Sequence, residues 1–459
     1  MTLIKSISGI RGTIGGATGE NLTPPDVVRF AAAFGTWAQQ QKTDSQTVVI
    51  GRDARTSGAA IAKLVGATLQ QLGLNVLDLG LSTTPTVEMA VVAEAAAGGI
   101  IITASHNPGN WNALKLLNHK GEFIDVEDGQ QVLDLADAGQ IEYATKPGTH
   151  RQDDTYLDKH IEAILNLPLV DTEAIAERGF RVVVDGVNSS GGVAVPKLLH
   201  ALGVTEIEAI FCEPTGIFAH NPEPLPENLT QISSRLESGN FDLGIVVDPD
   251  VDRLALITED GTPFGEEYTL VAVADYVLGK NNGGNTVSNL SSTRALRLVT
   301  EKHGGNYTAS AVGEVNVVKA MKAQDAIIGG EGNGGIIYPE LHYGRDALVG
   351  IALFLSHLAN FEGTARQLRN TYPNFHIEKK KVELTPEIDV DRVLTGMQNK
   401  YEKHPINTVD GVKIEFEEEW VHLRKSNTEP IIRIYAESQT QSTAEHLAKK
   451  IISDIREML

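Results

Sequence analysis

The chain has 459 residues, of which 41% are hydrophobic, and its formal net charge at pH 7 is −21. A chain of this length is expected to form about three domains, and its apolar content excludes intrinsic disorder. The negative charge argues against partners such as nucleic acid or anionic membranes, because binding to either needs clustered basic residues. The single cysteine, Cys212, excludes an internal disulfide and fits a reducing compartment. Since no apolar run has membrane-spanning length and no signal-peptide pattern begins the chain, we expect a cytoplasmic protein.

The first third of the chain alternates helical patterns with short apolar runs. Thr23 predicts the cap of a first helix, and the run 48–50 predicts a strand that ends in the turn 51–53. A second helix is expected to end at Leu72, and a strand over 75–79 follows it. This alternation predicts right-handed βαβ units and a parallel sheet.

The central motif of the first third is the polar stretch Thr103-Ala104-Ser105-His106-Asn107-Pro108, which follows the apolar run 99–102. The run is too short for a helix and rich in β-branched residues, so it predicts a buried parallel strand. Ligands bind at the carboxyl edge of open α/β sheets, and Ser105 is expected there beside the imidazole of His106. A plain polar loop remains the alternative.

Two later regions repeat the pattern of an apolar strand that runs into a polar loop. The strand expected over 243–247 leads into the acidic stretch 248–253, after a similar strand over 181–184. A third round has the run 326–328 before the glycine-rich stretch 329–335. These repeats predict three similar α/β units in tandem.

The pattern changes after about residue 372. A strand over 376–384, a helix over 388–401, and three more short strands that end at Ala436 predict a smaller α+β domain. A capping box at 442–445 predicts the start of the last helix. We expect mixed or parallel sheets in the first three units, with domain boundaries that give 1–150, 151–257, 258–372 and 373–459.

Three carboxylates lie close together in the second unit. Asp248, Asp250 and Asp252 alternate along a segment predicted to be extended, which would place them on one side. Such a cluster repels itself unless a hard cation lies between the oxygens. A calcium loop is disfavoured because Arg253 stands where that loop needs glycine, whereas a solvated acidic turn remains open. Three protein carboxylates leave coordination places free, which suits Mg²⁺ shared with a phosphate oxygen.

Other polar loops supply further groups for a phosphorylated polyol. Glu331 could accept hydrogen bonds from sugar hydroxyls, unless its loop is only a surface turn. The stretch 423–430 and Arg433 gather donors for a phosphate, with a polar hairpin as the alternative. Lys115 is the nearest candidate proton donor or acceptor to Ser105, although a lone lysine is commonly a surface charge. No G-x-S-x-G elbow surrounds the serine, so phosphoryl transfer through a phosphoserine is favoured over serine hydrolysis.

Taken in order, these motifs resemble the α-D-phosphohexomutase superfamily over essentially the whole chain. The resemblance is carried by Gly9-Ile10-Arg11-Gly12, by T-A-S-H-N-P with Asn112 and Lys115, by Pro214–Phe218 with Asn221–Pro224, and by D-P-D-V-D-R, G-E-G-N-G-G and R-K-S-N-T-E-P. It implies four domains around a central cleft. It also implies reversible transfer of phosphate between C6 and C1 of a hexose, through a phosphoserine and a bisphosphorylated sugar.

The resemblance further implies a role for each site residue. The catalytic group would be phosphorylated Ser105, Lys115 as general acid/base, Arg11 and His106 near the phosphoserine, and Arg253 near the reacting atoms. Mg²⁺ would bind Ser105, Asp248, Asp250 and Asp252. The sugar hydroxyls would contact Glu331 and Asn333, and the non-reacting phosphate would contact Arg424, Ser426, Asn427, Thr428 and Arg433. A hexose bisphosphate would act as activator, and the enzyme would be a monomer or a homodimer.

The chain departs from the usual family pattern at several positions. Pro249 and Val251 stand where glycines are usual, and Asn427 replaces another glycine. The sugar loop has Asn333-Gly334-Gly335 in place of Ser-Gly-His, so a second acid/base is not evident and His342 is a possible replacement.

The opening motif and the G-E-G-N-G-G loop most resemble phosphoglucosamine mutases of the superfamily. This implies interconversion of glucosamine 6-phosphate and glucosamine 1-phosphate, which feeds UDP-N-acetylglucosamine synthesis. Phosphomannomutase/phosphoglucomutase activity is the alternative within the superfamily. A phosphosugar phosphatase and a sugar-phosphate sensor are alternatives of other classes.

Overall fold

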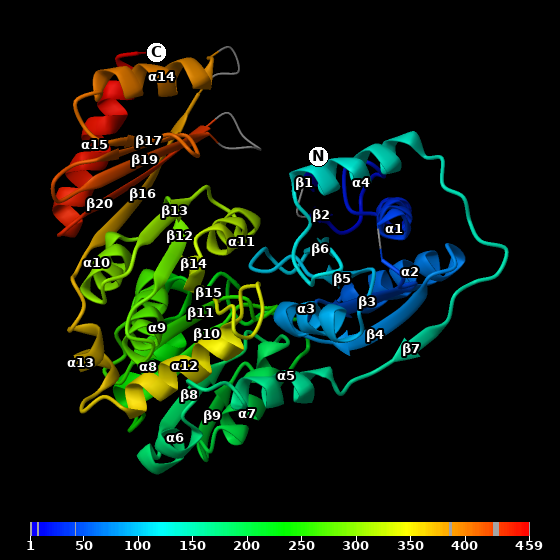
Figure 1. The fold of residues 1–459 in the computed structure, drawn as a ribbon, viewed down its shortest axis with the longest axis horizontal. Helices are drawn as coiled ribbons and strands as arrows, with labels where there is room; N and C mark the ends of the chain where they lie inside the picture. Colours follow the sequence, from blue (N-terminus) through cyan, green and yellow to red (C-terminus); the bar gives the residue numbers. More distant parts are fainter. Residues whose placement is uncertain (1, 7–8, 42, 385–387, 426–430, 459) are drawn as a thin grey trace.

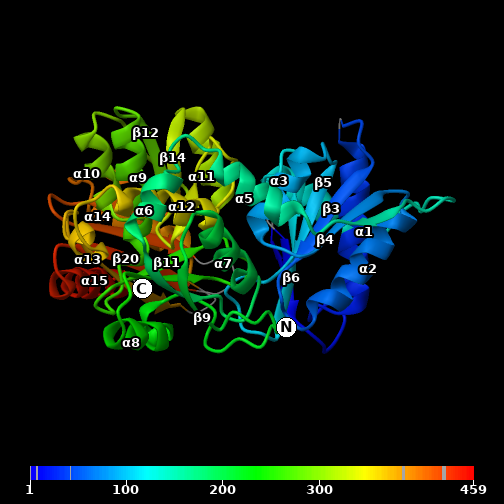
Figure 2. The same cartoon turned by 90° about the horizontal axis from the view of Figure 1, so that it is seen from below.

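The structure is a computed structural model that describes residues 2–6, 9–41, 43–384, 388–425 and 431–458. Over these residues the chain forms four units, each built on its own sheet. In Figure 1 the first unit (blue to cyan) and the C-terminal unit (orange to red) are separate lobes that border two central units (green to yellow). Figure 2 shows the first unit beside the central ones from below. The prediction of three α/β units followed by a smaller α+β unit is confirmed.

The first unit is an α/β layer with a seven-stranded sheet. Its elements are β1 (Ile4–Ser6), β2 (Gly9–Thr13), α1 (Pro24–Gln40), β3 (Thr47–Arg52), α2 (Gly58–Gln71), β4 (Asn75–Leu81), α3 (Thr84–Ala93), β5 (Gly98–Ile102), β6 (Trp111–Leu117), α4 (Val126–Ala138) and β7 (His150–Gln152). The strand order is β1-β2-β6-β5-β3-β4-β7. Helices α1, α2 and α4 pack on one face and α3 on the other, so the central strands are buried on both sides.

The two central units contain the second and third sheets. Their elements are α5 (Tyr156–Leu165), α6 (Thr172–Arg178), β8 (Arg181–Asp185), α7 (Gly191–Ala201), β9 (Glu206–Ile210), a 3₁₀ turn η1 (Pro226–Asn228), α8 (Thr230–Ser238), β10 (Leu243–Val247), β11 (Leu254–Thr258), α9 (Glu266–Lys280), β12 (Asn285–Asn289), α10 (Arg294–Lys302), β13 (Tyr307–Ser310), α11 (Glu314–Ala323), β14 (Ala326–Glu331), β15 (Gly335–Ile337), α12 (Ala347–Ala359) and α13 (Ala365–Arg369). Helix α12 is apolar on every side and is buried in a core shared by both units.

The same four-stranded arrangement occurs in all three α/β units. The strand orders are β6-β5-β3-β4, β11-β10-β8-β9 and β15-β14-β12-β13. In each unit the three strands that come first in the chain are parallel. The strand that comes fourth in the chain, which is β6, β11 or β15, lies antiparallel beside the third. The predicted tandem similarity is therefore confirmed. The ends of the third strands, β5, β10 and β14, are equivalent positions, and each is followed by one of the predicted site loops.

The C-terminal unit has an antiparallel sheet in the order β16-β20-β19-β18-β17. Its elements are β16 (His376–Glu383), α14 (Val390–Lys400), β17 (Ile406–Asn407), β18 (Val412–Glu415), β19 (Trp420–Lys425), β20 (Ile431–Ser438) and α15 (Gln441–Arg456). Four strands follow α14, where three were predicted. The cap of α15 is Thr440, whose Oγ1 accepts from the backbone N of Thr443 at 3.2 Å, so the predicted cap two residues later is wrong.

The first sheet is longer than the predicted limits of its unit. Strand β7 pairs with β4, so the first sheet extends past the expected boundary at residue 150. Among the described residues, no helix combines the length and the apolar character needed to cross a membrane.

Candidate active site

Ser105 lies in the loop after β5 and has an unusual backbone conformation. Its φ of +46° is in the left-handed region, which costs a residue with a side chain about 1–2 kcal/mol. The backbone N of Ser105 donates to Thr103 Oγ1 at 2.9 Å, and this hydroxyl donates to Asp53 Oδ2 at 2.6 Å. The strained serine is therefore held by buried polar contacts that continue from β3.

Arg55 is a positioning residue that the sequence analysis missed. It is 1% exposed, and its Nε donates to Asp53 Oδ2 at 3.0 Å. Its two terminal nitrogens donate at 2.6–2.8 Å to the carbonyl oxygens of Ser105, Asn107, Pro108 and Trp111. Burial raises the pKa of Asp53 to about 6, and the guanidinium opposes that rise. The available signal was an Arg-Asp-x-Arg turn at the carboxyl end of a strand that neighbours β5.

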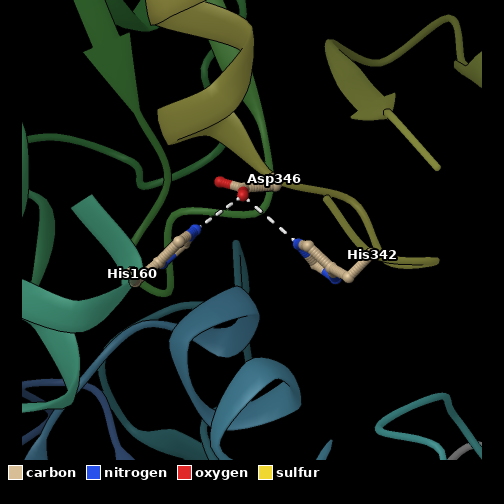
Figure 3. A group of neighbouring side chains, drawn as sticks. All are labelled: His160, His342 and Asp346. Carbon is tan, nitrogen blue, oxygen red and sulfur yellow. Dashed lines mark hydrogen bonds and ion pairs between the residues drawn. The ribbon is translucent and has the colours of Figure 1, made fainter. Parts of the chain in front are cut away.

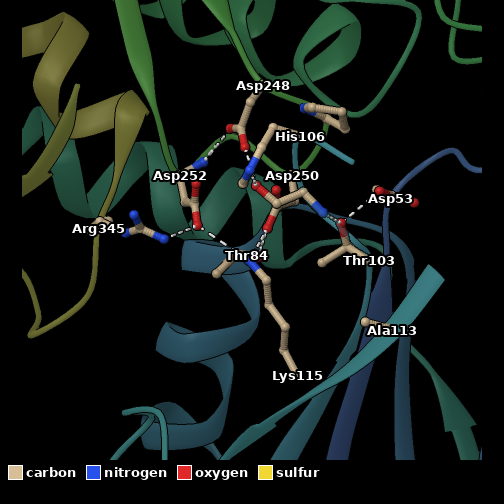
Figure 4. Close-up of polar contacts among 12 residues, drawn as sticks. Asp53, Thr84, Thr103, His106, Ala113, Lys115, Asp248, Asp250, Asp252 and Arg345 are labelled. Atoms are coloured by element: carbon tan, nitrogen blue, oxygen red, sulfur yellow. Dashed lines mark hydrogen bonds and ion pairs between the residues drawn. The ribbon is translucent and has the colours of Figure 1, made fainter. Parts of the chain in front are cut away.

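Asp248, Asp250 and Asp252 converge after β10 (Figure 4). All three are fully buried, and each offers an oxygen within 4.8 Å of the others. The segment is a turn, because Val251 has a φ of +65° and its N donates to the carbonyl of Asp248 at 3.1 Å. The prediction of an extended segment is therefore wrong, although the three carboxylates do lie together, as that prediction concluded. Alternate residues of a strand lie about 6.6 Å apart, so a turn gathers the carboxylates more closely.

Ser105 and Lys115 both contact this acidic triad. Ser105 Oγ donates to Asp248 Oδ2 at 2.6 Å, and Lys115 Nζ donates to Asp250 Oδ2 at 2.6 Å and to Asp252 Oδ2 at 3.3 Å. The lysine is on β6, which runs antiparallel beside β5 and so returns to the serine loop. Burial by itself lowers the pKa of Lys115, but the two aspartates raise it above its ordinary value.

The triad has the donors that a metal ion needs. Asp250 Oδ1 and Asp252 Oδ1 are buried and have no hydrogen-bond partner within the described part of the chain. The other Asp250 oxygen, Oδ2, also accepts from Thr84 Oγ1. Burial raises the pKa of Asp248 well above its ordinary value, with the neighbouring carboxylates adding to the effect. Clustered carboxylate oxygens without partners fit a hard divalent cation, which would relieve their repulsion.

Arg345 joins the acidic triad to the third unit, and it too was missed. Its Nη2 donates to Asp252 Oδ2 at 2.8 Å, and its Nη1 donates to Glu331 Oε2 at 2.9 Å. The Nε donates to Glu314 Oε2 at 2.9 Å. Burial lowers the pKa of the guanidinium, but the three carboxylates raise it by more, so the pKa lies well above its ordinary value. A lone arginine ten residues beyond the glycine-rich stretch carried no sequence signal for this role.

Glu331 is the last residue of β14, and this position differs from the predicted loop. It pairs with Gly335 of β15, so a tight hairpin forms. Its Oε1 accepts from Asn289 Nδ2 at 2.8 Å and from the backbone N of Gly313 at 3.1 Å. Asn333 lies in the turn, where its Oδ1 accepts from the N of Gly335 at 3.2 Å. Both oxygens of the glutamate therefore already have protein donors, and a sugar would share them.

A cavity of about 400 Å³ contains the reactive groups. It is lined by all five residues predicted to be catalytic, which are Arg11, Ser105, His106, Lys115 and Arg253. Burial, and then the charge of Arg253, lower the pKa of Arg11 below its ordinary value. The same two causes lower the pKa of His106 to about 3, so this imidazole is neutral at physiological pH.

An adjoining cavity of about 210 Å³ shares His106, Arg253 and Glu331 with the first. Arg424 and Arg433 line it from β19 and β20, where they lie directly opposite each other in register. Like charges at opposed positions destabilise a sheet, so the pair favours an anion. The predicted phosphate contacts Ser426, Asn427 and Thr428 lie outside the described residues. His342 lines neither cavity, so the structure does not place it as the replacement acid/base.

Known family domains and relatives match almost the whole length of the chain. The chain matches the four phosphoglucomutase/phosphomannomutase domains, which are alpha/beta/alpha domain I at residues 3–141, domain II at 158–261, domain III at 265–375 and the C-terminal domain at 378–453. A Thermococcus kodakarensis protein named phosphoglucomutase/phosphomannomutase is 33% identical over 455 residues, which are 98% of each chain. A Sulfurisphaera tokodaii phosphoglucosamine/phosphogalactosamine mutase is 30% identical over 96% of this chain and 97% of its own.

A solved structure has the same fold over nearly its full length. The phosphoglucomutase/phosphomannomutase family protein from Burkholderia thailandensis has a TM-score of 0.84 and 25% identity, and the match covers 99% of this chain and 97% of that chain. The four matched domains and the full-length relatives agree with the converging loops described above. The chain therefore belongs to the phosphoglucomutase/phosphomannomutase family of the α-D-phosphohexomutase superfamily.

Proposed function

We propose that this phosphohexomutase interconverts glucosamine 6-phosphate and glucosamine 1-phosphate through phosphorylated Ser105. The observation that carries the mutase chemistry is the contact of Ser105 Oγ with Asp248, in a cavity that opens onto a second cavity with paired arginines. A substrate with one phosphate at each end during the reaction fits two adjoining sites of this kind. One end reacts at the serine, and the other is held by Arg424 and Arg433.

The phosphoryl transfer proceeds in two balanced half-reactions. A sugar hydroxyl oxygen forms a bond to phosphorus while the bond between phosphorus and Ser105 Oγ breaks, and the hydroxyl proton passes to the neutral amine of Lys115. Asp250 and Asp252 favour the charged lysine, so a cation bound to these carboxylates would free the amine for this step. The resulting bisphosphate reorients and returns its other phosphoryl group to the serine, with Lys115 giving back the proton. Bound at Ser105, Asp248, Asp250 and Asp252, Mg²⁺ supplies neutralisation of the charge on the phosphoryl oxygens.

The remaining site residues hold the substrate during both half-reactions. Glu331 and Asn333 would contact sugar hydroxyls, since both line the cavity with the paired arginines. Arg11, His106 and Arg253 would surround the phosphoserine and keep water out of the reacting region. Ser426, Asn427 and Thr428 complete the proposed contacts to the non-reacting phosphate.

An unpaired carboxylate favours an amino sugar over a neutral one. Glu267 lines the second cavity, and its Oε2 accepts from the backbone N of Thr293 at 2.8 Å. The carboxylate of Glu267 lies against the backbone of Gly332. A side chain at that position would displace the carboxylate, because an added Cβ would lie 2.1 Å from both oxygens. No lysine, arginine or histidine among the described residues forms an ion pair with Glu267. Burial raises the pKa of Glu267 well above its ordinary value, and an ammonium at C2 of the sugar would favour the charged carboxylate as its ion-pair partner.

The relatives' names agree with two substrate classes. The Sulfurisphaera tokodaii relative is named for glucosamine and galactosamine phosphates, and the Thermococcus kodakarensis relative for glucose and mannose phosphates. Phosphoglucomutase/phosphomannomutase activity is therefore the second candidate. The carboxylate of Glu267 is the feature that ranks it second, because glucose and mannose carry no cation.

The deciding experiment compares kcat/KM for glucosamine 6-phosphate, glucose 1-phosphate and mannose 1-phosphate on enzyme primed with a hexose bisphosphate. We expect a preference of about tenfold or more for the amino sugar, which corresponds to about 1.4 kcal/mol. Glu267→Gln should remove this preference, whereas the control Glu266→Gln should keep it, since Glu266 already pairs with Lys379. A preference for glucose or mannose would overturn the substrate proposal, and no turnover of any sugar would overturn the mutase proposal.

The domain limits are also part of this proposal. We place the boundaries near residues 150, 257 and 372, close to the gaps between the matched family domains. Residue 257 lies within β11 and residue 150 begins β7, so limited proteolysis followed by mass spectrometry should give cuts in the connections that adjoin these strands and near residue 372. First cuts far from all three positions would move the boundaries.

A further inference from the structure

Figure 3 shows a second group of side chains that could hold a metal ion, and none of them lines either cavity. His160 is on α5, His342 precedes α12, and Asp346 is the N-cap of that helix. His160 Nε2 lies 2.9 Å from Asp346 Oδ2, and His342 Nε2 lies 3.2 Å from the same oxygen. The three donor atoms all lie within 4.8 Å of one another. Two imidazoles thus point at one carboxylate oxygen in the interior of the protein.

The outer atoms of His160 and Asp346 are held by hydrogen bonds, and the outer nitrogen of His342 faces a carboxylate. His160 Nδ1 is 2.9 Å from Thr86 Oγ1, and His342 Nδ1 is 3.3 Å from Glu88 Oε2. Asp346 Oδ1 accepts from the backbone N of Leu348 at 2.8 Å and from that of Val349 at 3.3 Å. Metal-ligating histidines characteristically donate their far nitrogen to a carboxylate or hydroxyl, which orients the ring. The inner atoms of the three residues, the two Nε2 atoms and Asp346 Oδ2, therefore face one another, and a bound ion would replace the contacts between them.

Two buried carboxylates, those of Glu88 and Asp346, belong to this group. Glu88 is 1% exposed, and neither of its carboxylate oxygens has a hydrogen-bond partner in the described structure. Burial by itself lowers the pKa of His342, but the two carboxylates raise it to about 10, so they attract a positive charge, which a proton on this imidazole or a bound metal ion can supply. Buried charges are costly unless they are paired or coordinate a metal. A divalent cation would cancel the two charges.

We propose that His160, His342 and Asp346 bind a divalent transition-metal ion of the zinc class. Two imidazole nitrogens and one carboxylate oxygen are donors that suit Zn²⁺, whereas the all-oxygen triad near Ser105 suits Mg²⁺. The ion has a structural role, because the group is buried and lies apart from the reactive cavity. Glu88 and Thr86 are on α3 of the first unit, so the ion also ties the first three units together.

Metal content measured by mass spectrometry tests this site. Protein stripped with a chelator is given Zn²⁺ in the presence of excess Mg²⁺, which occupies the carboxylate triad, and is then dialysed. We expect one Zn²⁺ per chain in the parent protein and loss of that ion in both His160→Gln and His342→Gln. The control His220→Gln should keep the ion, because His220 contacts Asp185 at 2.9 Å and the carbonyl of Asn221 at 2.8 Å, and no group of three ligands among the described residues includes it.

Two further measurements apply to the parent protein and so do not depend on the folding of a variant. Zn²⁺ in excess Mg²⁺ should raise its thermal unfolding midpoint, since an ion that binds only the folded state stabilises it. Co²⁺ in place of Zn²⁺ should give the intense visible bands of a nitrogen-ligated site of low coordination number. The proposal is overturned if the parent protein retains no Zn²⁺, if both variants retain it, or if Co²⁺ gives only the weak bands of an octahedral oxygen site. The group would then be an ion-pair cluster only.

Discussion

The two ends of the active-site cleft are built in opposite ways. At the reactive end, Ser105, Lys115 and the three aspartates are linked by short hydrogen bonds and are almost wholly buried. At the other end, Arg424 pairs with Asp410 at 3.0 Å, and Arg433 is exposed and lies opposite Arg424. Among the described residues, the groups of the reactive end therefore already hold one another in place, whereas the two arginines of the phosphate end repel each other until an anion binds.

The proposed mechanism gives the two ends different tasks. Charge would develop at the reactive end during transfer, and preorganised groups stabilise such charge without a cost of reorganisation. The phosphate end would hold either of two phosphates in turn, so equal binding of the ground state and the transition state would be enough there. Substitutions at the reactive end should therefore lower kcat, and substitutions at the phosphate end should raise KM.

The largest expected effect is that of Ser105→Ala at the reactive end. Without its Oγ no phosphoserine forms, so the mutase rate should fall by at least about 10⁴-fold, on the scale seen when nucleophiles are removed. The assay is sugar-phosphate interconversion with bisphosphate priming. As a control, Ser6→Ala removes another serine of the same cavity, whose hydroxyl only donates to Gly9, and should keep most activity. Equal loss in both variants would contradict the role of Ser105.

Asp250→Asn should have the next largest effect. It removes one charge from the metal-binding triad and from the partners of Lys115, so kcat should fall on the order of 10²–10³-fold with little change in KM. Steady-state kinetics at saturating Mg²⁺ measure both constants. Asp242→Asn is the control, since that residue pairs with Arg181 far from the cleft. A raised KM at unchanged kcat would erase the contrast between the two ends.

Arg424→Ala tests the phosphate end. The loss of one guanidinium should raise KM about 10–100-fold and change kcat less, because the contact is made in both ground and transition states. Arg433→Ala is the matched variant across the strand pair, and the double variant should show less than the sum of the two effects. If kcat falls instead and KM stays constant, the phosphate end is as preorganised as the reactive one.

The smallest expected effect is that of Asp410→Asn. Asp410 holds the Arg424 guanidinium at a partly exposed position, where an ion pair contributes at most about 1 kcal/mol. KM should therefore change by no more than about fivefold in either direction. Titration with inorganic phosphate as a competitive inhibitor measures the same change. A tenfold or larger effect would mean that this end is already ordered before binding.

The sequence analysis predicted the fold better than the contacts within the site. Alternating strands and helices predicted the tandem units, and loops after third strands were found as expected because parallel strands share a carboxyl edge. The structure also brings Ser105, Lys115 and the three aspartates together, although the aspartates come from the sheet of a different unit and Lys115 is on an antiparallel strand. The turn at Val251 was missed, since a left-handed β-branched residue has no sequence signature.

The contacts that the sequence analysis missed join residues that lie far apart in the chain and have no local sequence pattern. Arg55 and Arg345 are single arginines whose partners lie on other loops, so neither has a local pattern. Glu331 was placed in a loop because its neighbours are glycines, yet pairing with the following segment extends β14 to include it. His342 was named as a replacement for the missing acid/base, but the fold turns it toward Asp346 instead.

Arg345 and Asp346 are adjacent in the chain but serve different places, one the cleft and the other the junction of the first three units. The residue before them, Gly344, has no room for a side chain, because an added Cβ would lie 1.9 Å from Glu88 Oε2. An insertion or deletion between Ile337 and Asp346 would move both side chains off their targets at once. This connection should therefore keep its length during evolutionary divergence, even though surface connections usually vary freely in length.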